Sequence, residues 1–177
     1  NRNLLEQVND TREGQWPFAT VLSCIDSRTS AELIFDQGLG DIFSIRIAGN
    51  FANQDILGSM EFACNVAGSK LVVVLGHTKC GALKGGLDAP QIEGLGMDNL
   101  NHLIYHFESC IHEIIKEGEE RSSKNEDLLD RLTLCNIQKT IEDIRHQSST
   151  LRNLEKEGKI KIVGANYDVE TGVVTWL

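Results

Sequence analysis

Three side chains capable of chemistry follow the first apolar run of the sequence at alternate positions. The run "FATVL" ends at Leu22, and Cys24, Asp26 and Arg28 come directly after it. Alternate side chains of an extended backbone point to the same side, so these three share one face if the strand geometry persists. A thiolate on that face is a metal ligand or a nucleophile. The guanidinium of Arg28 would keep Asp26 ionised and hold it in place.

A second motif, "GHTKCGA", follows the apolar run "KLVVVLG" and adds His77 and Cys80 three positions apart. That spacing lets both side chains reach one ion across a tight turn. Together with Cys24 they make a set of two thiolates and one imidazole, which leaves the fourth position of a zinc ion open, as in catalytic sites. The alternative is two core thiols and a hydrogen-bonded loop histidine, but it leaves Asp26 and Arg28 unexplained.

Strand-like and helix-like segments alternate along the chain, and this order predicts an α/β fold with a mostly parallel central sheet flanked by helices. The last two strands are separated by a turn and form a hairpin at the sheet edge. Ligand sites of such sheets lie beyond the carboxyl ends of the strands, where both motifs fall. The expected strands are 18–22, 41–48, 70–76, 159–168 and 173–177, and the expected helices are 30–37, 56–67, 98–117, 128–144 and 150–157. A capping box of Thr29 and Glu32 is expected to start the first of these helices.

Length and composition suggest one domain over residues 1–177. The amphipathic segment "NLLEQV" has little local core to join, and residues 1–14 are expected to form an N-terminal helical arm. No apolar run approaches the roughly 20 residues of a membrane helix. The formal net charge of -9 argues against nucleic acid as a partner. The expected compartment is the cytoplasm. Residue 1 is Asn rather than Met, so a targeting segment could have been removed, and the periplasm or an organelle then remains an alternative.

The remaining cysteines and the paired histidines have structural interpretations. The chain has five cysteines, an odd number, and at this length it needs no disulfide framework, so reduced thiols or metal ligands are expected. Cys64, Cys110 and Cys135 lie among apolar residues of helix-like segments and are expected to be small buried hydrophobes. His102 and His106 are interpreted as surface histidines.

In five motifs, and in their order, the sequence resembles the β-class carbonic anhydrases, zinc enzymes that interconvert carbon dioxide and bicarbonate. The motifs are "CIDSR", "GDIFSIRIAGN", "GSMEFA", "GHTKCG" and "GANYDVETGVV", and they span nearly the whole chain. The resemblance implies Zn²⁺ on Cys24, His77 and Cys80. It implies that Asp26 and Arg28 act as a dyad on the fourth ligand, a hydroxide that attacks carbon dioxide, with Asp26 itself only a conditional fourth ligand.

The resemblance also implies a substrate pocket that composition and periodicity do not reveal. Contacts with the substrate would come from the Gln15 side chain and the Gly81 backbone N–H, within an apolar pocket lined by Phe43, Ala48 and Phe62. The sequence departs from the family pattern at Phe62, where plant members have Tyr, and at residue 47, which is Ile where many members have Asn. Both departures bear on the polarity of the pocket.

Two other functions stay open alongside carbon dioxide hydration. One is hydrolysis of carbon disulfide or carbonyl sulfide on the same fold, and the other is a non-catalytic zinc or thiol-redox module. The resemblance implies a homodimer or higher homo-oligomer, with the arm packed on a partner subunit. Some members bind bicarbonate at a regulatory pocket that includes Trp three residues before the first cysteine ligand. This chain has Val21 there, although Arg46 matches the family's arginine, so no such regulation is expected.

Overall fold

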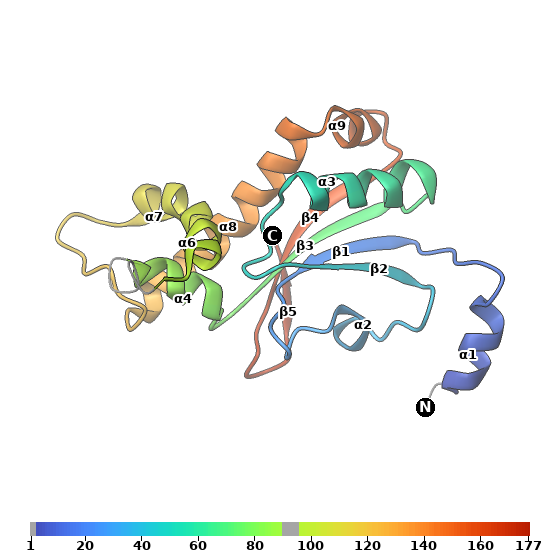
Figure 1. Cartoon of the computed structure of the whole chain (residues 1–177), viewed down its shortest axis with the longest axis horizontal. Helices are drawn as coiled ribbons and strands as arrows, with labels where there is room; N and C mark the ends of the chain where they lie inside the picture. The colour runs from blue at the N-terminus through green and yellow to red at the C-terminus, as the bar shows by residue number, and fades with distance from the viewer. Residues whose placement is uncertain (1–2, 90–95) are drawn as a thin grey trace.

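A five-stranded sheet forms the centre of the computed structural model, which describes residues 3–89 and 96–177 (Figure 1). Its strands lie in the order β2-β1-β3-β4-β5. The first four are parallel, and β5 pairs antiparallel with β4 as the predicted edge hairpin. The α/β fold with its mostly parallel sheet is therefore confirmed. The strands are β1 (Ala19–Ser23), β2 (Ile42–Arg46), β3 (Leu71–His77), β4 (Lys161–Tyr167) and β5 (Val174–Trp176).

The register of the parallel strands brings their carboxyl ends to one edge of the sheet. Ser23, the last residue of β1, pairs with Arg46 of β2 and with Leu75 of β3. Cys24 therefore leaves the sheet beside the end of β3, which is His77. The strand geometry does not persist through the first motif, because β1 ends before Cys24 and the next residues form a loop.

Helices cover the two faces of the sheet unequally (Figure 1). One face carries α3 (Gln54–Glu61), α8 (Glu126–Gln147) and α9 (Ser149–Lys156). A π-helical turn, η1 (Phe62–Val66), continues α3. On the other face, the described part of the chain places the short α2 (Ala31–Ile34). The core on the well-covered face joins buried strand and helix residues, among them Leu22, Met60, Val72, Val74, Ile137, Ile144 and Ile162.

A second apolar core lies beyond the carboxyl ends of the strands. It is built by α4 (Gly81–Leu87), α6 (Asp98–Ile104), a 3₁₀ turn η2 (Tyr105–Phe107) and α7 (Glu108–Ile114), packed against α8. The helix predicted over 98–117 is present, but η2 interrupts it. Phe107 of this turn is completely buried and belongs to this second core.

The capping box predicted for α2 is wrong. The N-cap residue is Ser30, and Thr29 uses its hydroxyl to donate to the backbone carbonyls of Cys24 and Asp26 instead. Glu32 accepts a hydrogen bond from the Ser30 hydroxyl rather than reaching back to a backbone N–H. The predicted helix over 30–37 shortens to four residues.

The expectation of free thiols is wrong for two of the three structural cysteines. Cys110 of α7 and Cys135 of α8 are disulfide-bonded, with 5.9 Å between their Cα atoms. The periodicity of each segment identifies a core-facing stripe but not which residues of two packed helices oppose each other. Cys64 is a free, buried thiol, as expected, and burial raises its pKa to about 11.

The N-terminal helix α1 (Leu4–Thr11) lies apart from the sheet and has no buried residue (Figure 1). Its apolar side chains Leu4, Leu5 and Val8 are exposed. A hydrogen bond from the Leu39 N–H to the Gln7 side chain, 2.9 Å long, ties it to the chain beside it. Residues 1 and 2 of the predicted arm lie outside the described residues. Within 3–89 and 96–177, no helix is long and apolar enough to cross a membrane.

Candidate metal centre

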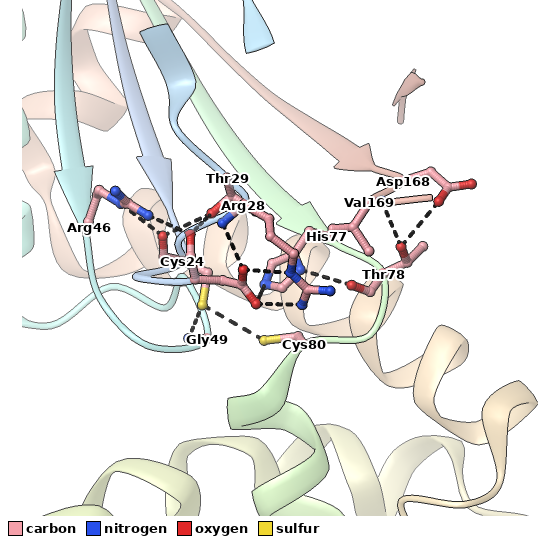
Figure 2. A network of polar contacts seen from close by, with 11 residues as sticks. Cys24, Arg28, Thr29, Arg46, Gly49, His77, Thr78, Cys80, Asp168 and Val169 are labelled. Atoms are coloured by element: carbon pink, nitrogen blue, oxygen red, sulfur yellow. Dashed lines mark hydrogen bonds and ion pairs between the residues drawn. The ribbon is translucent and has the colours of Figure 1, made fainter. Parts of the chain in front are cut away.

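Cys24, His77 and Cys80 form a buried cluster at the carboxyl edge of the sheet (Figure 2). The three side chains are at most 3% exposed. Their ligand atoms all lie within 4.8 Å of one another, and the two sulfur atoms are 3.9 Å apart. In the part of the chain that the structure describes, this is the one group of three or more His, Cys, Asp or Glu side chains arranged closely enough to hold a metal ion.

The tight turn after β3 brings Cys80 back to His77. Lys79 adopts a left-handed backbone conformation with φ of 57°, which reverses the chain between the two ligands. Cys80 is then the N-cap of α4. The β4–β5 loop supports this turn, because the Thr78 hydroxyl accepts a hydrogen bond from the Val169 N–H and donates to Asp168 (Figure 2).

His77 is prepared to act as a metal ligand. Its Nδ1 lies 2.9 Å from the Thr78 carbonyl oxygen, which can only accept, so Nδ1 carries the proton. The lone pair is then on Nε2, which faces the cluster. Nε2 is buried and makes no hydrogen bond within residues 3–89 and 96–177. A buried nitrogen without a hydrogen-bond partner is costly unless it binds a cation.

The two sulfur atoms are within hydrogen-bond distance of each other, at 3.9 Å. A hydrogen bond from Cys80 lowers the pKa of Cys24 to about 4, and the hydrogen bond with Cys24 in turn raises the pKa of Cys80. The Gly49 N–H also points at the Cys24 sulfur, 3.4 Å away, and helps to stabilise the thiolate. Thiolates are the form in which cysteines bind metals, and two of them with a neutral imidazole match the donor set of a zinc site.

Asp26 lies beside the cluster and is held by Arg28. The Arg28 Nε and Nη2 atoms donate to the two carboxylate oxygens at 2.9 and 2.7 Å, and the Arg28 backbone N–H donates to Oδ1 at 3.0 Å. These bonds lower the pKa of Asp26. Asp26 Oδ2 is 4.0 Å from Nε2 of His77, so the carboxylate faces the cluster without entering it. A turn, rather than the alternation of a strand, brings the predicted pair together.

Arg46 braces the loop between Cys24 and Asp26, a role that the sequence did not reveal. Its Nε donates to the Cys24 carbonyl at 3.0 Å and its Nη2 to the Asp26 carbonyl at 2.6 Å (Figure 2). Thr29 donates to the same two carbonyls. The only signal in the sequence is that Arg46 ends the strand next to β1, which becomes meaningful once the order of the strands is known.

Two of the five residues expected to contact substrate lie at the cluster. Gly81 directly follows Cys80 and is the first residue of α4. Ala48 directly precedes Gly49, whose N–H points at Cys24. Both are therefore next to ligand atoms of the cluster.

The other three lie toward the opposite end of the strands. Phe43 pairs with Thr20, which is four residues before Cys24, or about 13 Å along an extended strand. Phe62 packs edge-to-face on Phe43, with 6.3 Å between ring centroids. Gln15 is exposed and precedes β1 on the arm side. Within one copy of the chain, these three residues do not join the cluster.

The fold and the cluster together define an α/β protein with a potential metal centre at the carboxyl edge of its sheet. The family model for carbonic anhydrase matches residues 19–174. The chain belongs to the β-carbonic anhydrase family. Carbonic anhydrase 2 of Mycobacterium tuberculosis H37Rv is 33% identical over 159 residues, which cover 90% of this chain and 73% of the relative. The β-carbonic anhydrase CafA of Aspergillus fumigatus superposes with a TM-score of 0.84 at 26% identity, over 98% of this chain and 81% of CafA.

A further likeness is to a structure described as one of two tetrameric β-carbonic anhydrases of Sordaria macrospora. It superposes with a TM-score of 0.78 at 21% identity, over 94% of this chain and 83% of that protein. This likeness supports the fold.

Proposed function

We propose that this protein catalyses the reversible hydration of carbon dioxide to bicarbonate and a proton, with Zn²⁺ as its cofactor. The observation that carries the proposal is the buried Cys24–His77–Cys80 cluster with the ionised Asp26 beside it, 4.0 Å from Nε2 of His77. Family membership supports the same reaction.

Cys24, His77 and Cys80 would hold the zinc ion. The fit rests on the donor set and on the orphaned Nε2 of His77. Two thiolates and one imidazole leave one of four coordination positions for water or substrate. Zinc bound there supplies a Lewis acid that lowers the pKa of a coordinated water and so provides a nucleophile near neutral pH.

Asp26 orients that nucleophile. Its bidentate pairing with Arg28 keeps the carboxylate ionised and keeps it away from the ligand positions. An ionised carboxylate can only accept hydrogen bonds. It would therefore accept a hydrogen bond from a hydroxyl beside the cluster and leave the lone pair of that hydroxyl free to attack carbon dioxide. Arg28 fixes the orientation of Asp26, because it donates to both carboxylate oxygens and holds them beside the cluster.

We further propose that the working unit is a homodimer in which Gln15, Phe43 and Phe62 of one copy complete the pocket at the cluster of the other. In this fold these residues lie too far from their own Cys24 to line its pocket. Phe62 is 53% exposed, and the arm beside Gln15 exposes its apolar side chains. A second copy would cover these surfaces. The tetrameric assembly of the Sordaria protein is in line with further association of such dimers.

The cytoplasm is the compartment we propose. Cys24 and Cys80 are free thiols, and a reducing compartment keeps them available for zinc. The Cys110–Cys135 disulfide is the feature that would suit an oxidising compartment instead.

Stopped-flow hydration of carbon dioxide by the zinc-loaded protein tests the proposed reaction. We expect turnover that depends on zinc and rises with pH on the alkaline side of neutrality, because two thiolates leave bound water less acidic than three histidines do. Turnover of carbonyl sulfide or carbon disulfide in place of carbon dioxide would indicate the sulfur-analogue hydrolase. No activity with any of the three substrates would indicate a non-catalytic zinc module.

A further inference from the structure

The Gly49 backbone lies against Cys24 in a conformation that glycine alone accommodates. Its φ is 78°, and a β-carbon at this position would collide with the ring of Phe107. Its N–H donates to the Cys24 sulfur across 3.4 Å. The next residue, Asn50, is also left-handed, with φ of 42°. Two consecutive residues in this unusual region need support from their surroundings to keep one orientation.

Asn136 of α8 supplies such support from the other side of the loop. Its Nδ2 donates to the Gly49 carbonyl oxygen at 2.8 Å. Asn136 is 5% exposed, and it lies one position before Ile137, which is completely buried in the core of the sheet. A buried amide in this position is costly unless it is hydrogen-bonded, and its donor is used on Gly49. Helix α8 therefore holds the carbonyl group of Gly49. The N–H of the same residue donates to the Cys24 sulfur.

We propose that Asn136 is a positioning residue for the metal ligand Cys24, because its bond to the Gly49 carbonyl keeps the Gly49 N–H on the Cys24 sulfur. A hydrogen bond to a thiolate withdraws electron density from the sulfur and tunes the bond that it makes to a metal. The consequence for metal binding rests on the proposed zinc function. The link from Asn136 to the N–H···S bond does not, since it involves only residues of the chain.

The first test reads the N–H···S bond directly and does not depend on whether a metal is bound. In the protein as purified, the Gly49 amide proton is followed by NMR in the wild type, in Asn136→Leu and in Asn136→Asp. Leu removes the amide at similar volume, and Asp keeps the shape of Asn but presents an acceptor to the Gly49 carbonyl. We expect the Gly49 proton resonance to move upfield and its exchange with solvent to speed up at least about tenfold in both variants. If Asn136→Leu does not fold, Asn136→Asp decides.

The second test reads the effect on the metal. Without the N–H···S bond, the Cys24 thiolate is a stronger electron donor. With Co²⁺ in place of zinc, we therefore expect the sulfur-to-cobalt charge-transfer band of Asn136→Leu to lie at longer wavelength than that of the wild type. Loss of a group that supports a metal ligand typically weakens metal affinity about 10- to 100-fold. We therefore expect zinc transfer from Asn136→Leu to a chromophoric chelator to be more favourable than transfer from the wild type by that factor. The matched control is Thr140→Val, which changes another buried polar residue of α8, 2% exposed, one turn further along. It should move neither the Gly49 resonance nor the cobalt band.

An unchanged Gly49 resonance in both Asn136 variants would overturn the proposal. So would equal shifts in Thr140→Val, because they would show a general loosening of α8. A wild-type protein that binds neither cobalt nor zinc would count against the proposed function, whereas the Gly49 resonance would still decide the role of Asn136.

Discussion

The two ends of the parallel strands differ in how far contacts within one chain bury the side chains that lie there. At the carboxyl end, Cys24 and His77 are buried, and groups of the same chain hold the Cys24 sulfur and His77 Nδ1 by hydrogen bonds. Three buried side-chain atoms there, His77 Nε2, Ser23 Oγ and Asn50 Nδ2, have no hydrogen-bond partner among the described residues. At the amino end, α1 has no buried residue, and Leu4 and Leu5 are 64% and 69% exposed. The first region is organised within one copy, whereas the second has the character of an unfinished interface.

This difference follows from the cost of each kind of exposure. Buried thiolates and an imidazole must be held by hydrogen bonds from the same chain, because a loose polar group in a core is expensive. Apolar side chains at a surface cost less while exposed and gain when a second copy covers them. Metal binding should therefore survive changes at the amino end, while assembly should survive changes at the carboxyl end.

The largest effect is expected from removing a ligand. Cys24→Ala, His77→Ala and Cys80→Ala should each lose zinc and carbon dioxide hydration together, since two protein ligands make an inadequate zinc site. The matched control is Cys64→Ala, which removes a buried thiol outside the cluster. Atomic absorption after gel filtration measures the zinc. Stoichiometric zinc in any of the three ligand variants would take that residue off the ligand set.

Asp26→Asn should separate catalysis from metal binding at the same end of the strands. The amide fills the same space but cannot act as an ionised acceptor, so we expect full zinc occupancy with kcat lowered about 10²- to 10⁴-fold. Stopped-flow hydration and zinc analysis on one preparation measure both quantities. A wild-type kcat would refute the role of Asp26, and loss of zinc would show that it acts on the metal itself.

The amino end is tested by making the arm polar. Leu4→Ser combined with Leu5→Ser should raise the dissociation constant of the dimer by at least about a hundredfold, because burying each leucine contributes about 1.5–3 kcal/mol. Zinc content should not change, but activity should fall as the dimer dissociates. Glu6→Ser on the same helix is the control. Light scattering over a micromolar dilution series reports the assembly, and an active wild-type monomer would contradict the proposed dimer pocket.

The sequence predicted the carboxyl end better than the amino end for a physical reason. Ligand chemistry is local: the motifs around Cys24 and His77 each fit on one turn, and alternation of strands and helices is enough to bring two such turns to one edge. The contacts that brace them are not local. Arg46 reaches Cys24 and Asp26 from the neighbouring strand β2, and Asn136 reaches Gly49 from a helix, 87 residues away in sequence. Neither contact has a signature in spacing.

The wrong predictions have the same origin. The predicted capping box is absent because the Thr29 hydroxyl donates hydrogen bonds to the backbone carbonyls of Cys24 and Asp26 in the preceding loop. The free-thiol prediction failed because Cys110 and Cys135 are on separate helices whose relative register is set by packing around Phe107 and its neighbours. The positions of Gln15, Phe43 and Phe62 relative to the cluster depend on a second copy in our proposal, and no pattern within one chain encodes that arrangement.

Reducing the Cys110–Cys135 disulfide measures how much the link between α7 and α8 contributes to stability. Unfolded, unreduced protein should show three reactive thiols of its five cysteines. Cys110 and Cys135 enclose a loop with a sequence separation of 25, so a reductant should lower the free energy of unfolding by about 3 kcal/mol and Tm by roughly 10 °C. The Cys110→Ala/Cys135→Ala variant should already have the lower Tm and should not respond to the reductant. Five reactive thiols would show that the pair is reduced.

The smallest effect concerns the charge of Asp26. Arg28 lowers the pKa of this carboxyl in the folded protein, so the pair stabilises the fold above the unfolded-state pKa, near 3.9, and that contribution disappears as pH falls through the lower folded-state pKa. In Arg28→Met the pKa of Asp26 should rise toward the unfolded value, and the acid unfolding midpoint should move to slightly higher pH. Carbon-13 NMR of the carboxyl resonance measures the pKa, and circular dichroism measures the midpoint. Lys159→Met, which breaks an exposed ion pair with Glu157 far along the chain, is the control. An unshifted Asp26 pKa would show that the loop carbonyl contacts of Arg46 and Thr29, rather than Arg28, fix the environment of the carboxylate.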